Sequence, residues 1–174
     1  MNNFINNWDE DLKLAQKAIP IQNAIYNNIF QIKNIKRFSK DNDFILDTHY
    51  HIDVELELKN GIKLLGQEKA LRYQFSNFNT FTIEFFQNRF TREKGEFFNL
   101  GAQFYLHGYF NDIEDKFEKW YLIKIFDFLT YLKKTPIEIL EESTKPTTHS
   151  NASFYYIDYG NIPINFIYTK KCRS

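Results

Sequence analysis

Residues 52–69, IDVELELKNGIKLLGQEK, decide the fold of this chain. The first part alternates cleanly, with Ile52, Val54, Leu56 and Leu58 on one face and acidic residues on the other. The part after Asn60-Gly61 alternates in the same way, and alternation with a period of two is typical of β-strands with one buried face. The stretch therefore predicts two antiparallel strands, Ile52 to Leu58 and Ile62 to Lys69, joined by a tight turn.

The apolar pattern also predicts the register of this hairpin. A two-residue turn would pair Lys59 with Ile62 and would place charged residues on the apolar face. A three-residue loop, Lys59-Asn60-Gly61 with a left-handed glycine, pairs Leu58 with Ile62 instead. Because a slip of one residue would invert the faces, we expect the second register, which stacks Leu56 on Leu64 and sets Asp53 opposite Gln67.

Polar side chains that suit metal-assisted chemistry then share one face of the hairpin: Asp53, Glu55, Gln67 and Lys69. Hydrolysis of a phosphodiester uses a hard divalent cation, which carboxylates and neutral oxygen ligands hold. Asp53 and the amide oxygen of Gln67 can ligate Mg²⁺ or Mn²⁺, and Lys69 can orient the attacking water or stabilise the developing charge. Glu84, on the strand expected next, is a further ligand or a partner for Lys69. A face of alternating charged residues is also typical of a hairpin that is exposed to solvent. That these residues have no function beyond contact with water therefore stays an alternative.

Asp53 followed after a turn by Gln67-Glu68-Lys69 resembles the signature of the PD-(D/E)XK nuclease superfamily. In that superfamily an Asp lies at one strand and an acidic-x-Lys triplet lies on the next. The resemblance covers residues 9 to 87 and implies a restriction-endonuclease-like fold with a mixed central sheet flanked by helices. It implies a Mg²⁺-dependent or Mn²⁺-dependent nuclease acting on DNA or RNA, with Asp53, Gln67 and Glu68 as metal ligands. The chain departs from the pattern at Gln67, where the triplet has an acidic residue.

Two residues are expected on the substrate side of this site. Arg72 lies three residues beyond Lys69 and can contact a phosphate. His51 is a candidate groove residue near the scissile phosphate. Cleavage of both strands of a duplex commonly takes two sites, so a homodimer is a further possibility.

Other functions are kept beside the nuclease. His49 and His51 resemble the His-x-His metal strand of amidohydrolases and metallo-β-lactamase-like enzymes, but Val54 stands where the latter have a histidine, and the amidohydrolase barrel needs a longer chain. Gln67 and the zero net charge of the chain favour a non-catalytic nucleic-acid-binding or assembly protein that retains the fold.

The rest of the chain predicts an α/β (α+β) arrangement in one domain, residues 1–174. A helical pattern runs from Asp9 to about Lys33 and is expected to break at Pro20. Further strands are expected at Phe44–Thr48, Thr80–Phe86, Gln103–Phe110 and Lys119–Phe126, helices at Glu96–Leu100, Asp127–Lys134 and Pro136–Glu142, a loop at Ser143–Ala152, and a final hairpin from Phe154–Tyr159 and Ile164–Tyr168.

Composition sets outer limits on these functions. The 43% hydrophobic residues, with 19 Phe and 11 Tyr, are enough for a packed core. The single cysteine, Cys172, excludes an internal disulfide and a zinc site built from cysteines. Without a signal-peptide pattern or an apolar segment long enough to span a bilayer, we expect a cytoplasmic protein that does not enter a membrane.

Overall fold

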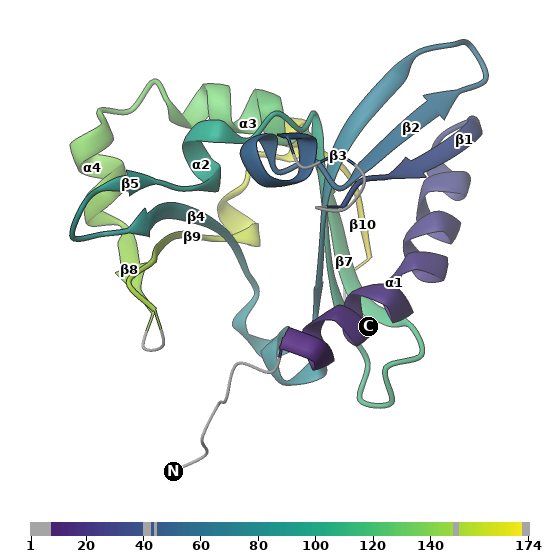
Figure 1. Cartoon of the computed structure of the whole chain (residues 1–174), viewed down its shortest axis with the longest axis horizontal. Coiled ribbons are helices and arrows are strands. Elements are labelled where there is room, and N and C mark those ends of the chain that lie inside the picture. The colour runs from purple at the N-terminus through teal and green to yellow at the C-terminus, as the bar shows by residue number, and fades with distance from the viewer. Residues whose placement is uncertain (1–7, 40–42, 44, 148–149, 172–174) are drawn as a thin grey trace.

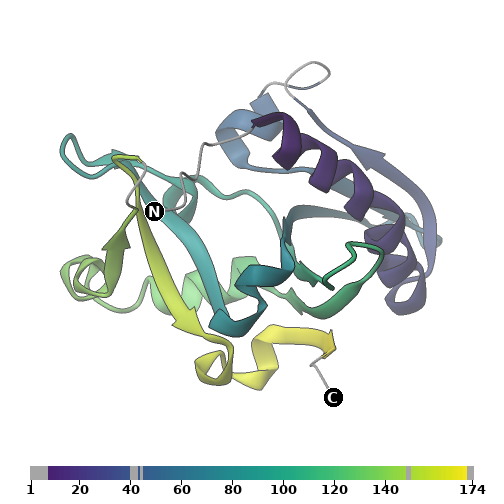
Figure 2. The same cartoon turned by 90° about the horizontal axis from the view of Figure 1, so that it is seen from below.

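The computed structural model describes residues 8–39, 43, 45–147 and 150–171. Two β-sheets form the frame of the molecule, and helices cover their faces, so the predicted mixed α/β class is confirmed. Figures 1 and 2 show α1 on one side of the larger sheet and the smaller sheet on the other side.

The larger sheet has six strands in the order β1-β2-β3-β6-β7-β10. The pairing of β3 with β6 is parallel, and the other pairings are antiparallel. The bounds of the strands are β1 Ile32–Arg37, β2 Val54–Leu58, β3 Lys63–Leu71, β6 Phe104–Phe110, β7 Phe117–Ile123 and β10 Ile167–Lys171.

The hairpin of β2 and β3 has the predicted register. Leu56 pairs with Leu64, and the Leu58 amide donates to the Ile62 carbonyl over 2.8 Å. Gly61 has a φ of 82°, the left-handed conformation that closes a three-residue loop and that glycine adopts without a steric penalty. The apolar pattern therefore predicted this register correctly.

The smaller sheet has four strands in the order β5-β4-β9-β8, and its pairings are antiparallel. Its strands are β4 Thr80–Asn88, β5 Glu93–Lys94, β8 Thr144–Pro146 and β9 Ser153–Asp158. The first two belong to the long connection between β3 and β6, whereas the last two come from the C-terminal part of the chain.

The N-terminal helix α1 runs without a break from Trp8 to Ile29, so the predicted interruption at Pro20 is wrong. Pro20 is exposed, so water can bond the carbonyl that loses its helical partner. Buried Leu14, Ala18 and Ile25 hold both halves of the helix against the sheet. The helix is also shorter than expected at its end, because Ile32 already begins β1.

Three short α-helices follow, α2 Glu96–Asn99, α3 Ile125–Leu132 and α4 Ile137–Glu142. They lie near the helices expected from the sequence. The predicted strand Lys119–Phe126 is displaced, since β7 ends at Ile123 and Phe126 is already helical. Three 3-10 turns complete the helical part, η2 Tyr73–Phe78, η3 Tyr159–Asn161 and η4 Ile164–Phe166.

Two other expectations about local structure are wrong. The predicted strand Phe44–Thr48 is a π-helical turn, η1 Ile45–His49, and Phe44 itself lies outside the described residues. The predicted final hairpin does not form, because β9 pairs with β4 in one sheet and β10 pairs with β7 in the other. Alternation marked both strands but carried no information about their partners. The loop expected at Ser143–Ala152 contains the short strand β8, and its residues 148 and 149 lie outside the described part.

Two apolar cores lie on opposite faces of the larger sheet. One fills the space between α1 and that sheet, with Tyr26, Leu56, Phe104 and Leu106 fully or almost fully buried. The other lies between the two sheets and α3 and is rich in aromatic rings. Among the helices of the described residues, none is long and apolar enough to cross a membrane.

Candidate functional site

Asp53 immediately precedes β2, at the point where that strand meets the middle of β3. Its amide donates to the Gly66 carbonyl over 2.9 Å, which continues the hairpin pairing by one residue. Its Oδ2 accepts from the Glu68 amide over 2.8 Å. With the side-chain amide of Gln67 oriented to satisfy its surroundings, the Gln67 nitrogen donates to Asp53 Oδ2 over 3.2 Å and to the His51 carbonyl. The structure thus brings Asp53 and Gln67 into direct contact.

The Asp53 carboxyl has an unusual affinity for protons. Burial raises its pKa to about 7, and the backbone hydrogen bond from Glu68 only partly opposes this effect. The negative charges of Glu68, Asp47 and Glu96 raise the pKa further. Near neutral pH the carboxyl is therefore shared between its protonated and ionised forms.

Lys69 extends from β3 toward the smaller sheet. Its Nζ lies 3.5 Å from Thr82 Oγ1 on β4 and 5.6 Å from the ring centre of Phe154 on β9. Burial lowers the pKa of this ammonium, while the charges of Glu96 and Glu84 act in the opposite direction. The ammonium therefore lies between the two sheets, where two glutamates counter its charge.

Glu84, on β4, is half-buried, and its charge acts to raise the pKa of Lys69. Burial raises the pKa of its carboxyl, and the Lys69 charge opposes that rise. The strand pairing of β4 with β9 fixes its position, because Glu84 lies opposite Phe154.

Glu96, at the start of α2, is a site residue that the sequence did not reveal. It is only 7% exposed, and its carboxylate accepts from the Tyr105 hydroxyl and from the Glu84 backbone. Its Oε1 is buried without a hydrogen-bond partner, and burial raises the pKa of the carboxyl to about 7. The local sequence, one acidic residue followed by two phenylalanines, did not predict that this carboxyl is buried. The carboxyl is buried because α2 packs on β4.

The charge of the Glu96 carboxylate acts on both Asp53 and Lys69. Its charge raises the pKa of Asp53 on one side and of Lys69 on the other. We call the set of Asp53, Gln67, Lys69, Glu84 and Glu96 the acidic-lysine cluster. Its members lie on or beside both sheets and at the start of α2, and they comprise three carboxyls, one amide and one ammonium.

Glu68 lies on the other face of β3. Its carboxylate accepts from Arg37 Nε over 3.1 Å, from Arg37 Nη2 over 2.9 Å and from the Tyr26 hydroxyl over 2.8 Å. This bidentate ion pair is largely buried beneath α1. Glu68 was predicted as a metal ligand in the same site as Gln67 and Lys69. The structure does not bring its side chain together with theirs.

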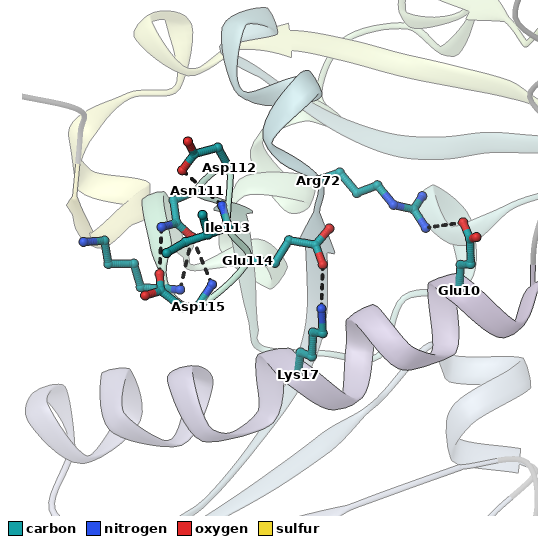
Figure 3. A network of polar contacts seen from close by, with 9 residues as sticks. Glu10, Lys17, Arg72, Asn111, Asp112, Ile113, Glu114 and Asp115 are labelled. Atoms are coloured by element: carbon teal, nitrogen blue, oxygen red, sulfur yellow. Dashed lines mark hydrogen bonds and ion pairs between the residues drawn. The ribbon is translucent and has the colours of Figure 1, made fainter.

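Arg72, predicted on the substrate side, is bound to the beginning of α1. Its guanidinium lies 3.5 Å from Glu10 Oε2 and 3.0 Å from Asp11 Oδ1, and Figure 3 shows it directed toward that helix. The same view shows Lys17 of α1 paired with Glu114 over 2.8 Å. Arg72, directly after β3, thus binds to α1 and is not directed at the acidic-lysine cluster.

The histidines do not form the metal strand that their spacing suggested. His49 belongs to the π-helical turn η1, and His51 has a φ of 49°, so the two do not share the face of a strand. Burial lowers the pKa of the His51 imidazole. The backbone carbonyl of His51 accepts a hydrogen bond from the side-chain amide of Gln67. His51 lies next to the cluster through its backbone.

A divalent cation needs several oxygen ligands, and the carboxyls near Asp53 are the candidates for them. Within the described residues, no three His, Cys, Asp or Glu side chains come together as a metal group. Burial raises the pKa of both the Asp53 and the Glu96 carboxyl to about 7, so each is shared between its protonated and ionised forms near neutral pH, and one Glu96 oxygen has no partner. A divalent cation would satisfy that oxygen, and carboxylate oxygens such as those of Asp53 and Glu96 are the ligands that Mg²⁺ or Mn²⁺ would take.

A cavity of about 670 Å³ lies beside the cluster, between α1 and the larger sheet. Asp53 and Gln67 line it together with Glu68, and α1 forms its opposite wall. The side chains of Leu12, Ala15 and Ile19 are the apolar part of that wall.

No protein family, curated protein or solved structure matches this chain. The restriction-endonuclease-like fold therefore stays a prediction, and the geometry described above is the basis for the function.

Proposed function

We propose that the chain is a divalent-cation-dependent nuclease whose active site is the acidic-lysine cluster. The observation that carries this proposal is the contact of Asp53, directly before β2, with Gln67 of the Gln67-Glu68-Lys69 triplet on β3. The helix α1 precedes the β2–β3 hairpin, and the strand that follows the triplet, β4, belongs to the smaller sheet. The expected substrate is DNA, with RNA as the alternative.

Four residues of the cluster have separate roles in this proposal. Asp53 and Glu96 supply the anionic oxygens that hold Mg²⁺ or Mn²⁺, and Glu96 provides the second negative charge that Gln67 lacks. When bound, the cation polarises the phosphate and lowers the pKa of water. Gln67 fixes the orientation of the Asp53 carboxylate through its amide. Lys69, already between the two sheets, offsets the negative charge that develops on the phosphate.

The proposal predicts cation-dependent cleavage that requires Asp53 and Lys69. Labelled single-stranded and double-stranded DNA and RNA are incubated with Mg²⁺, with Mn²⁺ or with a chelator. Asp53→Asn keeps the shape of the side chain and is expected to lower the cleavage rate at least about 100-fold, and Lys69→Met is expected to have a similar effect. The matched control is Glu55→Gln, because Glu55 lies on the same hairpin but pairs with Lys63 over 2.9 Å.

Circular dichroism checks that each variant is folded. Undiminished cleavage by folded Asp53→Asn, or equal losses in the Glu55 control, would refute the assigned site. Cleavage that continues in the chelator would refute the role of the cation.

A second candidate is a non-catalytic nucleic-acid-binding protein with the same fold. The orientation of Gln67 favours it, because its amide nitrogen already satisfies the Asp53 oxygen that a cation would take. Calorimetric titration with Mn²⁺ separates the two candidates. Binding that Asp53→Asn and Glu96→Gln both abolish supports the nuclease, whereas an absence of binding to wild-type protein, with or without DNA, supports the binding protein.

A further inference from the structure

The smaller sheet has one buried face and one half-buried face. On the buried face, Ile83, Phe85 and Tyr155 belong to the core between the two sheets. Because side chains alternate along a strand, the intervening residues of β4 and β9 point to the opposite face, where they are half-buried or exposed. Figures 1 and 2 show α2 and α3 on the side of the buried face. We call the opposite side the outer face, and it includes Thr82, Glu84, Lys145, Phe154, Tyr156 and Asp158.

Two aromatic side chains are neighbours on the outer face. Phe154 and Tyr156 are two residues apart on β9, so their Cα atoms are roughly 6.6 Å apart. Each ring has an ammonium group near it. Lys69 Nζ lies 5.6 Å from the centre of the Phe154 ring, and Lys145 Nζ lies 5.6 Å from the centre of the Tyr156 ring. Surfaces that bind single-stranded nucleic acid combine these two kinds of group, since bases stack on aromatic rings and cations bind the phosphates.

Lys145 supplies a cation that a phosphate can reach. It is exposed on the edge strand β8, opposite Phe154. Within the part of the chain that the structure describes, it forms no ion pair, and its ammonium contacts the Tyr156 ring. A base that stacks on Tyr156 would displace this ammonium from the ring, and a phosphate of the same nucleic-acid strand would then bind it.

The acidic side chains of the outer face lie away from Lys145. Glu84 is two strands away, with Phe154 between them, and its charge acts on Lys69. Asp158 is four residues beyond Phe154 on β9, and its Oδ1 accepts from the Gly160 amide over 2.6 Å and from Asn79 Nδ2 over 3.4 Å. The surface around Lys145, Phe154 and Tyr156 is therefore basic and aromatic.

The outer face is continuous with the acidic-lysine cluster. Lys69 belongs to the cluster, and its Nζ lies 3.5 Å from Thr82 Oγ1 on the outer face. Glu84 belongs to both, since it lies opposite Phe154 on β4. A strand of nucleic acid that follows β9 from Tyr156 to Phe154 therefore arrives at Lys69.

We propose that the outer face of the smaller sheet binds single-stranded nucleic acid next to the acidic-lysine cluster. Two successive unpaired bases stack on Tyr156 and Phe154, and Lys145 binds a phosphate of the same strand. A base within a duplex is already stacked on both sides and does not offer its ring, so the surface selects single strands. As a statement about the substrate this inference rests on the proposed nuclease function, because Lys69 and Glu84 belong to both the cluster and the outer face.

The test measures binding in a chelator, without cleavage. A labelled single strand of about 12 nucleotides, within the usual range of site sizes, and its duplex are titrated with the full chain and followed by fluorescence anisotropy. We expect the single strand to bind at least about fivefold more tightly than the duplex. Tyr156→Ala should weaken single-strand binding at least about fivefold, as the loss of one stacked base requires, and Tyr156→Phe should keep it.

A second variant tests the phosphate contact at an exposed position. Lys145→Met should make the slope of log affinity against log salt shallower by about 0.7, the value for one phosphate contact on a single strand, whereas Tyr156→Ala should leave the slope unchanged.

The chain offers a matched control pair elsewhere. Lys124 Nζ lies 5.1 Å from the centre of the Tyr168 ring, and that ring contacts Phe30 of α1. Tyr168→Ala and Lys124→Met therefore remove the same kind of lysine–tyrosine contact away from the outer face, and both should leave single-strand binding and its salt dependence unchanged. Equal binding of the duplex, unchanged single-strand binding by folded Tyr156→Ala, or equal losses in the control pair would overturn the inference.

Failure of the nuclease proposal has a different signature. A protein that binds the single strand through Tyr156 and Lys145 but cleaves no nucleic acid supports the binding surface and refutes the nuclease. Cleavage of single strands that is unchanged in both Tyr156→Ala and Lys145→Met refutes the surface and leaves the nuclease proposal intact.

Discussion

Replacement of Glu96 by glutamine changes how the stability of the fold depends on pH. In the folded protein the pKa of Glu96 is raised from 4.5 to about 7, chiefly by burial. Between these two pH values the folded state binds more protons than the unfolded state. Stability therefore falls as pH rises through this window, and above it the loss is complete. The glutamine in Glu96→Gln does not titrate. The free energy of unfolding of this variant should therefore fall less with rising pH than that of the wild type.

The size of the effect follows from the pKa shift. One pKa unit corresponds to about 1.4 kcal/mol, so the whole window contributes roughly 3 kcal/mol. Between pH 5 and pH 8, the free energy of unfolding of the wild type should fall by about 2.5 kcal/mol relative to that of Glu96→Gln. Comparing changes with pH, and not absolute stabilities, removes any constant effect of the substitution on packing.

Urea denaturation of both proteins at four pH values between 5 and 8 measures this difference. The control is Glu55→Gln, which replaces a carboxylate at the surface of the larger sheet. A variant that parallels the wild type across the whole range would refute the reasoning, because it would mean that Glu96 does not titrate in this window. If the free energy of unfolding fell more steeply with pH in the variant than in the wild type, the predicted direction of the effect would be wrong.

Three further perturbations test other parts of the site. Gly66→Ala would place its new carbon 2.1 Å from the ring of Phe104, so the free energy of unfolding in urea should fall by about 3 kcal/mol. Adding Phe104→Leu should restore part of this loss, and an unchanged stability of Gly66→Ala would contradict the packing. Arg37→Met leaves the Glu68 carboxylate buried without its ion partner and should cost about 3 kcal/mol, whereas the double replacement with Glu68→Gln should recover much of this loss in a double-mutant cycle. Arg72→Ala removes partly exposed ion pairs with α1, so the free energy of unfolding should fall by less than about 1 kcal/mol, and by less still in high salt. Nucleic-acid affinity should be unchanged, and a large loss of affinity would indicate that Arg72 contacts the substrate.

The hairpin could be predicted from sequence because its information is local. Alternating apolar residues and the glycine at position 61 together allow one register, and the contact between Asp53 and Gln67 follows from it. The same alternation places Glu68 on the opposite face from Lys69. The family signature drew attention to Glu68 as a ligand, although the strand period already separated the two side chains.

The rest of the site depends on contacts between distant parts of the chain. Nothing near Glu96 in the sequence indicates that α2 packs on β4 and turns this carboxyl inward. The π-helical turn that separates His49 from His51 likewise has no local apolar pattern. Alternation identified β9 as a strand, but only the tertiary structure decides that its partner is β4.

The parallel pairing of β3 with β6 has a consequence for how the molecule folds. The connection between these strands holds β4, β5 and α2, and the partners β8 and β9 of that smaller sheet arrive only after β7 has been added to the larger one. No single cut in the chain yields both sheets complete. Because Lys69 lies on one sheet and Glu84 on the other, a nascent chain that stops before β9 contains every residue of the cluster but not the framework that holds Glu84 in place. We therefore expect the site to be acquired late in folding, in the same cooperative step that completes both sheets.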